Sequence, residues 1–201
     1  MLRIGVTGGI GSGKSMVCTY FEKMQVPVYY ADDEARRIID THAGIRKKLT
    51  AYFGPRAYTA RGLNKPFIRK QVFGNPEAIH FLNITTHPVV IAHFVSWSKD
   101  RKKEKHPYVL KEAALIFESG SNRELDYIVC VTAPEEERIQ RVMQRDHRSR
   151  EEVQSIMQRQ MPEAEKIRLS NAVIYNNQNT LLLPQLVALE QQFNTLSTHG
   201  N

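Results

Sequence analysis

Residues 8–15 constrain the fold more than any other stretch of this sequence. They run Gly-Gly-Ile-Gly-Ser-Gly-Lys-Ser and match the phosphate-binding loop pattern G-x-x-x-x-G-K-[ST] at every fixed position. Residues 2–6 before them form a short, mostly apolar run that suits a buried parallel strand. Apolar positions after them share one helical face, at Val17, Tyr20, Phe21 and Met24. Strand, loop and helix in this order predict a nucleoside triphosphate site, and a glycine-rich turn without a ligand is the alternative.

Each residue type in this loop has a physical role. Glycines allow the tight turns that bring N–H groups close to an anion, and the helix that begins near Gly13 directs its positive dipole end at the same point. Lys14 is expected to bridge the β- and γ-phosphates, and the Ser15 hydroxyl is expected to bind Mg²⁺. The predicted ATP-binding residues of the segment are Gly9, Gly11, Ser12, Gly13, Lys14, Ser15 and Met16.

The composition, with 41% apolar and 24% charged residues among 201, is typical of a soluble globular protein. No apolar run approaches the roughly 18 residues of a membrane span, and no signal-peptide pattern is present. Cys18 and Cys130 lie in apolar patterns, so we expect buried, reduced thiols and a cytoplasmic protein. The net charge of +7 suits phosphorylated small molecules. Because no aromatic-basic module is visible, we expect neither nucleic acid nor a membrane as a partner.

Asp32 follows the apolar residues 26–30, which are predicted to form a second strand. Ligands of open parallel sheets bind beyond the carboxyl ends of the strands, so Asp32 is placed near the phosphate loop. There a carboxylate could accept a hydroxyl proton or position metal-bound water. A helix N-cap is the alternative role for Asp32 or Asp33, because a helical pattern follows from Glu34, and spacing alone does not separate the two.

Residues 41–105 are predicted to form a helical insertion that holds a second substrate. Apolar spacing and breakers indicate four helices with no strand between them. The first contains Ile45, Leu49 and Phe53, and the other three begin near residues 64, 75 and 87. One face of the first helix would carry Tyr52, and one face of the second would carry Phe73. His80, His87 and His93 do not have the spacing of a metal site.

Two acids end apolar stretches in the following region. Glu112 closes residues 107–112, a predicted strand, and is a weak candidate for the Mg²⁺-water partner. Glu118 closes residues 113–118 and is the substrate-side alternative.

A basic helix follows the predicted strand 126–132. Arg138, Arg141 and Arg145 are spaced by three and four residues and therefore share one face. Arginine suits bidentate phosphate contacts, so a mobile lid that closes over the phosphates is favoured over a plain surface helix. Ser149 and Glu152 form a capping box for the next helix, which is expected to end at residues 161–162.

The alternation of strands and helices predicts an α/β fold of the P-loop NTPase type, with a parallel five-stranded sheet and helices on both faces. A last strand is expected at residues 172–177 and a terminal helix along Leu186, Leu189, Phe193 and Leu196, with a frayed tail from Ser197. We expect a single domain, residues 1–201. It would comprise a nucleotide core (about 1–40, 106–135 and 170–201), the insertion (about 41–105) and the lid (about 136–169).

Several stretches, in order along the chain, resemble the dephospho-coenzyme A kinases. The phosphate loop with Thr7 before it is similar to that family's extended loop. The further matching stretches are Ala31-Asp32 with Ala35-Arg36, Leu82-Asn83-x-x-x-His87-Pro88, Leu115-Ile116-Phe117-Glu118, Arg141-x-x-x-Arg145-Asp146 and Val173-Ile174-Tyr175-Asn176. The resemblance covers about residues 4–177.

This resemblance implies transfer of the ATP γ-phosphate to the ribose 3′-hydroxyl of dephospho-coenzyme A. Asp32 would be the base or hydroxyl-orienting residue, and Lys14, Arg141 and Arg145 would stabilise the transferring group. Asn176 would lie near the adenine of ATP, and the acceptor side would comprise Asp32, Arg36, His87 and Glu118. The implied partners are ATP with Mg²⁺ and dephospho-coenzyme A, for a monomer or weak homo-oligomer.

The chain departs from the family pattern at a few positions. Tyr30 stands where the family has its first Asp, which leaves Asp32 alone in that role. Ala114 replaces a Pro, and Met16 replaces a frequent Thr. A nucleoside or nucleoside monophosphate remains the alternative acceptor. A nucleotide-dependent switch or a nucleic-acid-binding ATPase is the third hypothesis. The sequence lacks the Asn-Lys-x-Asp motif of guanine-nucleotide switches, whereas the net charge of +7 keeps nucleic-acid binding open.

Overall fold

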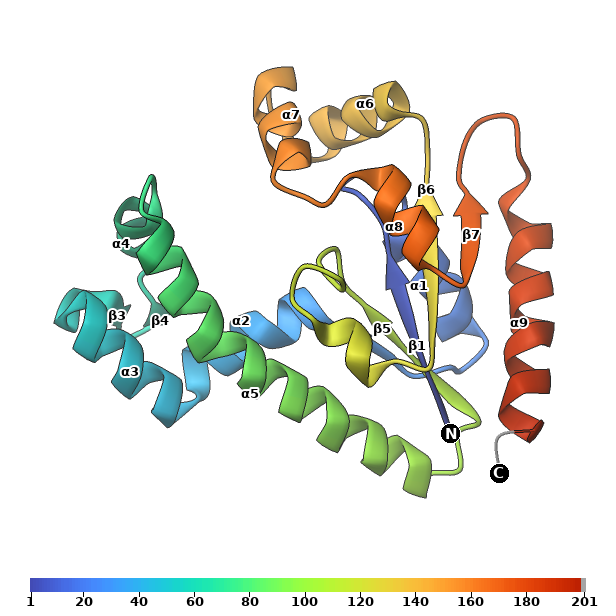
Figure 1. Ribbon diagram of the computed structural model, residues 1–201, viewed down its shortest axis with the longest axis horizontal. Helices are drawn as coiled ribbons and strands as arrows, with labels where there is room; N and C mark the ends of the chain where they lie inside the picture. Colours follow the sequence, from blue (N-terminus) through green and yellow to red (C-terminus); the bar gives the residue numbers. More distant parts are fainter. Residues whose placement is uncertain (200–201) are drawn as a thin grey trace. The chain divides into compact units, whose positions relative to one another are not determined.

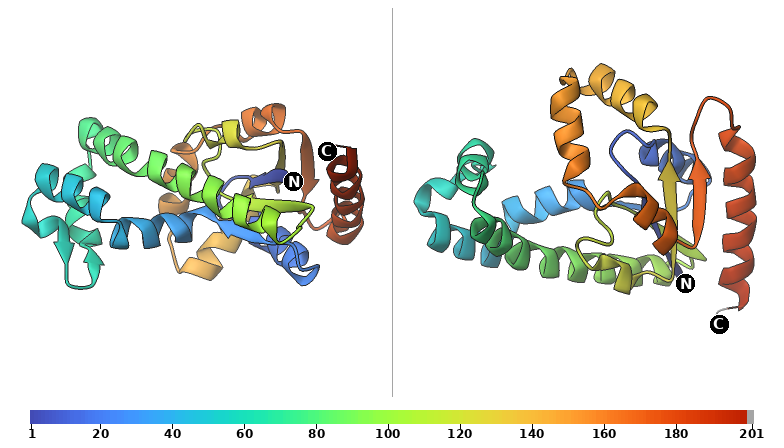
Figure 2. Two further views of the ribbon diagram at one scale, coloured as in Figure 1. Left: turned by 90° about the horizontal axis from the view of Figure 1, so that it is seen from below. Right: turned by 45° about the horizontal axis from the view of Figure 1, so that its top comes forward.

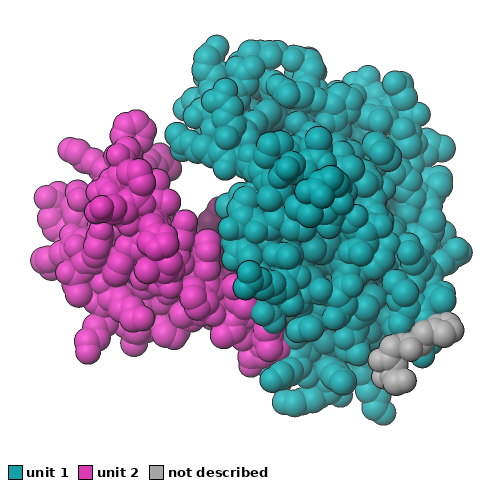
Figure 3. All heavy atoms as spheres, in the orientation of Figure 1, with its two compact units in different colours: residues 1–30, 97–201 teal, residues 31–96 magenta. Residues whose placement is uncertain are grey.

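The structure of the chain, a computed structural model, describes residues 1–199. The chain divides into two compact units, which are coloured separately in Figure 3. Unit 1 comprises residues 1–30 and 97–201, and unit 2 comprises residues 31–96. The division into core, insertion and lid at residues 40, 105 and 135 stays a prediction.

Unit 1 is built on a parallel five-stranded sheet with the strand order β2-β5-β1-β6-β7 (Figure 1). Its strands are β1 (Leu2–Thr7), β2 (Val28–Tyr30), β5 (Tyr108–Glu112), β6 (Tyr127–Thr132) and β7 (Ala172–Tyr175). The central strand β1 is followed directly by the phosphate loop, so the loop lies at the carboxyl edge of the sheet. The predicted parallel sheet is confirmed.

Helices α1 (Lys14–Lys23) and α9 (Leu182–His199) cover one face of this sheet. Alternate residues of the strands, such as Ile4 and Val6, pack there against Phe21 and Phe193. In both views of Figure 2, α9 runs beside the edge strand β7. The side chain of Gln185 in α9 binds the backbone of Tyr175 in this edge strand. It accepts from the Tyr175 amide at 2.9 Å and donates to the Tyr175 carbonyl at 3.0 Å. An edge strand whose backbone groups are bonded in this way is protected from pairing with other chains.

Some expectations for these two helices are corrected. Met24 lies just beyond the end of α1 and is 49% exposed, because the chain turns there toward β2. Leu196 is 38% exposed and does not belong to the buried face of α9. The predicted frayed tail from Ser197 is wrong as far as His199, which ends α9, and the rest of it lies outside the described residues.

The opposite face of the sheet is covered by residues 113–125, which include η2 (Ser121–Glu124), and by α8 (Glu163–Leu169). A side chain at Gly5 would collide there with Leu125 and Ile116. Helix α8 was not predicted, because its seven residues are mostly charged. It nevertheless buries Lys166 completely.

Helices α6 (Glu135–Asp146) and α7 (Arg150–Gln158) form the predicted lid region. The capping box of Ser149 and Glu152 is confirmed, and Val153 is buried. Helix α7 ends at Gln158, three residues before the predicted stop. Arg138 is buried, whereas the Arg145 side chain at the end of α6 is 60% exposed.

Unit 2 contains α2 (Ala31–Thr41), α3 (Ala43–Phe53), η1 (Pro55–Ala57), β3 (Tyr58–Thr59), β4 (Gly62–Leu63), α4 (Lys65–Val72) and most of α5 (Pro76–Lys103). Its core includes Ile38, Leu49, Ile68 and Val90. His42 and Asn64 cap α3 and α4 through side-chain acceptors. Phe73 follows α4 and is 80% exposed, and Tyr52 is 46% exposed, so neither lies on a buried face.

Two further expectations for unit 2 are wrong. An antiparallel pair, β3 and β4, interrupts the predicted run of helices, because two-residue strands are too short to show a periodic pattern. The third and fourth predicted helices are one 28-residue helix, α5, with Pro88 inside it. A proline inside a helix removes one backbone donor and disfavours the helix by about 3 kcal/mol, so His87-Pro88 in the sequence favours a helix start.

By length and composition alone, α5 could cross a membrane, and it is the single such helix in the described part of the chain. The sequence did not predict a membrane-spanning helix here, because His and Thr interrupt the apolar residues of 78–95. The same residues nevertheless contain no Asp, Glu, Lys or Arg. Helices in the cores of soluble proteins pass the same test.

Candidate active site

The phosphate loop of unit 1 connects β1 to α1 in a conformation that only glycine tolerates at several positions. Gly8 has φ of 146°, and a side chain there would clash with the Val131 carbonyl of β6. Gly13 has φ of 98° and is the N-cap of α1. The N-terminus of α1, which is the positive end of the helix dipole, therefore borders the loop, as required for binding an anion.

Lys14 extends from the first turn of α1 back over the loop. Its Nζ donates to the carbonyl oxygens of Gly8 at 3.1 Å and Gly9 at 3.4 Å. The same ammonium lies 3.8 Å from Oε1 of Glu112, at the carboxyl end of β5. Both side chains are largely buried, with 11% and 13% exposure. The predicted phosphate-binding lysine and the weakly predicted acid are thus brought together.

Arg138 of α6 holds the beginning of the loop. Its side chain is 7% exposed and forms an ion pair with Glu163 of α8, with Nη2 at 2.7 Å from Oε2. A side chain at Gly9 would collide with the Arg138 guanidinium, and one at Gly11 would collide with the Arg138 carbonyl. Helix α6 therefore packs directly on the loop, and this packing requires glycine at both positions.

Gln160 adds a hydrogen bond to the same part of the loop. Its Oε1 accepts from the Ile10 amide at 3.0 Å. The bond joins the segment between α7 and α8 to the phosphate loop.

Asn176 and Arg141 hold the other end of the loop. Nδ2 of Asn176 donates to the Ser12 carbonyl at 2.8 Å. Arg141 donates to the Asn176 carbonyl at 2.9 Å and to the Gly11 carbonyl at 3.5 Å. Its side chain remains 35% exposed and is paired with Glu137 at 2.9 Å. Two residues predicted from distant motifs therefore meet at this loop.

Glu118 binds elements within unit 1. Its Oε1 accepts from Nζ of the buried Lys166 at 2.9 Å and from the Met161 amide at 2.8 Å. Burial by itself would raise the pKa of Glu118, but these hydrogen bonds outweigh it and the pKa is lowered. Lys166 also donates to the Ala114 carbonyl at 2.7 Å. Glu118 thus supports the segment that carries Gln160.

The remaining predicted residues of unit 1 are more exposed. Ser15 is exposed in the first turn of α1, and Met16 is 59% exposed beside it. Arg145 at the end of α6 pairs with its neighbour Asp146 at 2.7 Å, and its side chain is 60% exposed. Cys18 and Cys130 are free and buried as predicted, and burial raises the pKa of both thiols, that of Cys130 to about 11.

Asp32, Arg36 and His87 belong to unit 2. Helix α2 begins at Ala31, so Asp32 and Asp33 lie in its first turn and not at its N-cap. Both are exposed, and Asp33 pairs with Arg36 at 3.0 Å. His87 is half-buried in α5, and this burial lowers its pKa.

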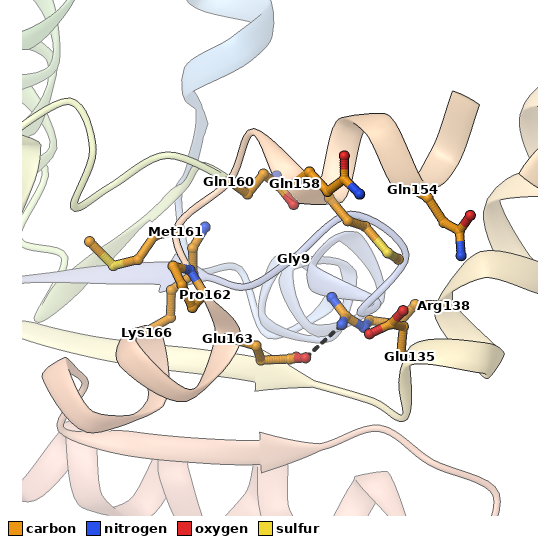
Figure 4. Close-up of a pocket in the computed structure, with 11 residues that line it drawn as sticks. Gly9, Glu135, Arg138, Gln154, Gln158, Gln160, Met161, Pro162, Glu163 and Lys166 are labelled. Atoms are coloured by element: carbon orange, nitrogen blue, oxygen red, sulfur yellow. Dashed lines mark ion pairs between the residues drawn. The ribbon is translucent and has the colours of Figure 1, made fainter. Parts of the chain in front are cut away.

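A cavity of about 440 Å³ lies in unit 1 between the phosphate loop and helices α6, α7 and α8 (Figure 4). It begins at Gly9 and includes the ion pair of Arg138 with Glu163. Glutamine side chains of α7 and of the following segment line it, together with Met157 and Met161. Sequence patterns did not indicate these residues, because they come from α7, a loop and the unpredicted α8.

Known proteins resemble this chain along most of its length. A family model described as dephospho-CoA kinase matches residues 2–181. A curated dephospho-CoA kinase of Bacteroides fragilis is 37% identical over 188 residues, which cover 94% of this chain and 91% of that protein. A solved structure from Thermus thermophilus, TT1252, is 34% identical with a TM-score of 0.79, and 97% of each chain is covered. The structure of a dephospho-CoA kinase from Campylobacter jejuni is 25% identical with a TM-score of 0.72, over 96% of this chain and 97% of that chain.

Proposed function

The chain belongs to the dephospho-CoA kinase family, and we propose that it transfers the γ-phosphoryl group of ATP to the 3′-hydroxyl of dephospho-coenzyme A, giving coenzyme A and ADP. The observation that carries this proposal is the complete phosphate loop at the carboxyl edge of a parallel sheet, with Lys14 and Glu112 side by side. Proteins with this arrangement act on nucleoside triphosphates.

The donor side of the site is formed by the loop and α1. The ATP phosphates would be bound by the predicted loop residues, and Asn176 would lie near the adenine. These loop residues are Gly9, Gly11, Ser12, Gly13, Lys14, Ser15 and Met16. The Lys14 ammonium, which donates to the Gly8 and Gly9 carbonyls in this structure, would neutralise charge on the γ-phosphate.

The residues present also fit Mg²⁺ delivered with ATP. No group of three or more His, Cys, Asp or Glu side chains in residues 1–199 is arranged to hold a metal ion. Mg²⁺ typically keeps several waters and binds through one or two protein oxygens together with substrate phosphates. The exposed Ser15 hydroxyl and the Glu112 carboxylate supply such oxygens, and the ion would supply charge neutralisation.

The acceptor side comprises Asp32, Arg36, His87 and Glu118, as the family resemblance implies. Asp32 would take or orient the proton of the 3′-hydroxyl, and Arg36 and His87 would contact the acceptor. Arg141 and Arg145 would stabilise the transferring phosphoryl group, and closure of the lid would exclude water. Arg141 suits this role because its guanidinium is partly exposed beside the loop.

The substitution Asp32→Asn tests this assignment. It removes the proton acceptor but keeps the size of the side chain, so ATP binding should persist while kcat falls by at least about hundredfold. ADP release with dephospho-coenzyme A measures kcat, and Asp33→Asn is the matched control from the same exposed helix turn. Near-normal turnover of Asp32→Asn would reject Asp32 as the base.

A panel of acceptors tests the substrate. Dephospho-coenzyme A should stimulate ADP release strongly, whereas nucleosides and nucleoside monophosphates should not. Strong stimulation by a nucleoside monophosphate alone would favour the alternative acceptor class. We further propose that the enzyme works in the cytoplasm as a monomer or weak homo-oligomer, without nucleic acid or a membrane as a partner.

A further inference from the structure

The cavity beside Gly9 has no role in the mechanism above. Its volume of about 440 Å³ lies within the roughly 300–1,000 Å³ of small-molecule sites. Glu135 and Arg138 come from α6, Gln154, Met157 and Gln158 from α7, and Glu163 and Lys166 from α8 (Figure 4). We call it the glutamine pocket, because Gln154, Gln158 and Gln160 all line it.

The position of Lys14 shows which end of the triphosphate faces this pocket. In phosphate loops the lysine contacts the β- and γ-phosphates. Here its ammonium lies against the carbonyl groups of Gly8 and Gly9. The γ-phosphate end of bound ATP would therefore lie near Gly9, where the pocket begins, and the nucleoside of ATP would lie toward the other end of the loop. A group in the pocket would belong to the acceptor.

The charge of the pocket argues against an acceptor phosphate. Its lining contains two cations, Arg138 and Lys166, and two carboxylates, Glu135 and Glu163. Both cations are already paired, Arg138 with Glu163 and Lys166 with Glu118. An uncharged polar group is the better match, because a diphosphate needs cations that are not already neutralised.

The side chains supply the contacts that a purine base requires. The side chains of Gln154 and Gln158 form no hydrogen bond with another residue among 1–199, and each side-chain amide offers donors and an acceptor. Met157 and Met161 provide polarizable surface for an aromatic ring. The planar guanidinium of Arg138, fixed by Glu163, provides a surface on which a ring can stack.

We infer that the glutamine pocket binds the adenine base of the acceptor, dephospho-coenzyme A. The base and the 3′-hydroxyl are attached to the same ribose, so binding of the base beside Gly9 would bring the hydroxyl close to the γ-phosphate. The pocket therefore selects the acceptor and orients its sugar. This inference rests on the proposed function.

Substitution of the two unpaired glutamines tests the inference. Gln154→Ala and Gln158→Ala should each raise KM for dephospho-coenzyme A by about tenfold, the loss expected for one or two hydrogen bonds. KM for ATP should stay within about twofold of the unaltered protein. Gln144→Ala is the matched control, because Gln144 is exposed on α6 and does not line the pocket.

The outcomes separate this inference from the proposed function. If the unaltered protein does not phosphorylate dephospho-coenzyme A, the proposed function fails. If it does, but both variants keep the KM values of the control, the pocket does not bind the acceptor base. A rise in KM for ATP alone would overturn the inference too, because the pocket would then hold the base of the donor.

A change in the substrate gives a second, independent test that no folding defect can imitate. An acceptor with hypoxanthine in place of adenine lacks the 6-amino group and should show a KM about tenfold higher with the unaltered protein. With the double variant of Gln154→Ala and Gln158→Ala, the two acceptors should differ by less than about twofold. Equal discrimination by both proteins would place base recognition outside the pocket.

Discussion

The two ends of the phosphate loop are held by different kinds of contact. At the Gly9 end (Gly9 and Ile10), Gly9 packs against the guanidinium of the buried Arg138–Glu163 pair, and the Ile10 amide donates to Gln160. The Gly13 end (Gly11, Ser12 and Gly13) is held by hydrogen bonds from Asn176 and Arg141 to its carbonyl groups. The Arg138 side chain is 7% exposed, whereas the Arg141 side chain is 35% exposed on the same helix.

This difference in burial indicates that the two arginines of α6 have different roles, one structural and one in the reaction. A buried ion pair cannot rearrange cheaply, since separating its partners leaves a desolvated charge. Arg138 is therefore part of the rigid scaffold of the loop. Arg141 keeps solvent contact and carbonyl partners that a phosphate could replace, so it suits a role in the reaction.

The largest expected effect separates these two arginines. Arg138→Met should lower the free energy of unfolding by about 3 kcal/mol, because Glu163 would lose its buried partner. Arg141→Met should cost about 1 kcal/mol or less, because its pair with Glu137 is partly exposed. Urea unfolding measures both. Equal losses of stability would mean that the contrast in burial has no energetic consequence.

Activity should show the reverse order. Arg141→Met is expected to lower kcat by about hundredfold, the usual cost of losing one group that stabilises a transition state. If Arg141→Met left kcat unchanged, the division of labour between the two arginines would be rejected.

The phosphate loop and the sheet could be predicted because their signals are local. The loop motif fixes four positions within eight consecutive residues, and the strands are short and mostly apolar. Lys14 and Glu112 were placed near each other because each ends or follows a neighbouring parallel strand. The resemblance to the family added Asn176 and Arg141, which the structure brings together.

The scaffold behind the loop could not be predicted, because it depends on packing between segments far apart in the sequence. Arg138, Arg141 and Arg145 have the same helical spacing, and only the approach of α8 decides which one is buried. A lysine in a mostly charged segment is expected at the surface, but Lys166 is buried. The ion pair with Glu118, 48 positions earlier in the sequence, offsets the cost of burying its charge. The start of α2 at Ala31 could not be predicted either, because the sequence fits equally well with Asp32 as the N-cap and with Asp32 in the first turn.

A second prediction concerns the support of the Gly9 end. Glu118→Gln should lower the free energy of unfolding by about 2 kcal/mol near neutral pH, because Lys166 and the Met161 amide lose a charged acceptor. The folded-state pKa of Glu118 lies below 4.5. The contribution of the Glu118 carboxylate to the free energy of unfolding is therefore complete above pH 4.5. It is lost as the pH falls through the folded-state pKa.

Urea unfolding between pH 7 and pH 3 checks this prediction. The difference between the unaltered protein and Glu118→Gln should shrink below pH 4.5 as Glu118 becomes protonated. Glu165→Gln, at an exposed position of α8, is the control and should change little at any pH. A difference that stays constant to pH 3 would mean that the charge on Glu118 does not support this end of the loop.

The smallest effect is expected at the Gly13 end. Asn176→Ala removes one hydrogen bond to the Ser12 carbonyl and should cost about 1 kcal/mol of unfolding free energy. Because the loop then loses its tether where the donor nucleotide is proposed to bind, KM for ATP should rise about fivefold while KM for dephospho-coenzyme A stays near its usual value. Gln178→Ala, two residues further along and exposed, is the control. If Asn176→Ala instead raised KM for the acceptor, the two ends of the loop would not serve separate substrates, and the assignment of the Gly9 end to the acceptor would lose its basis.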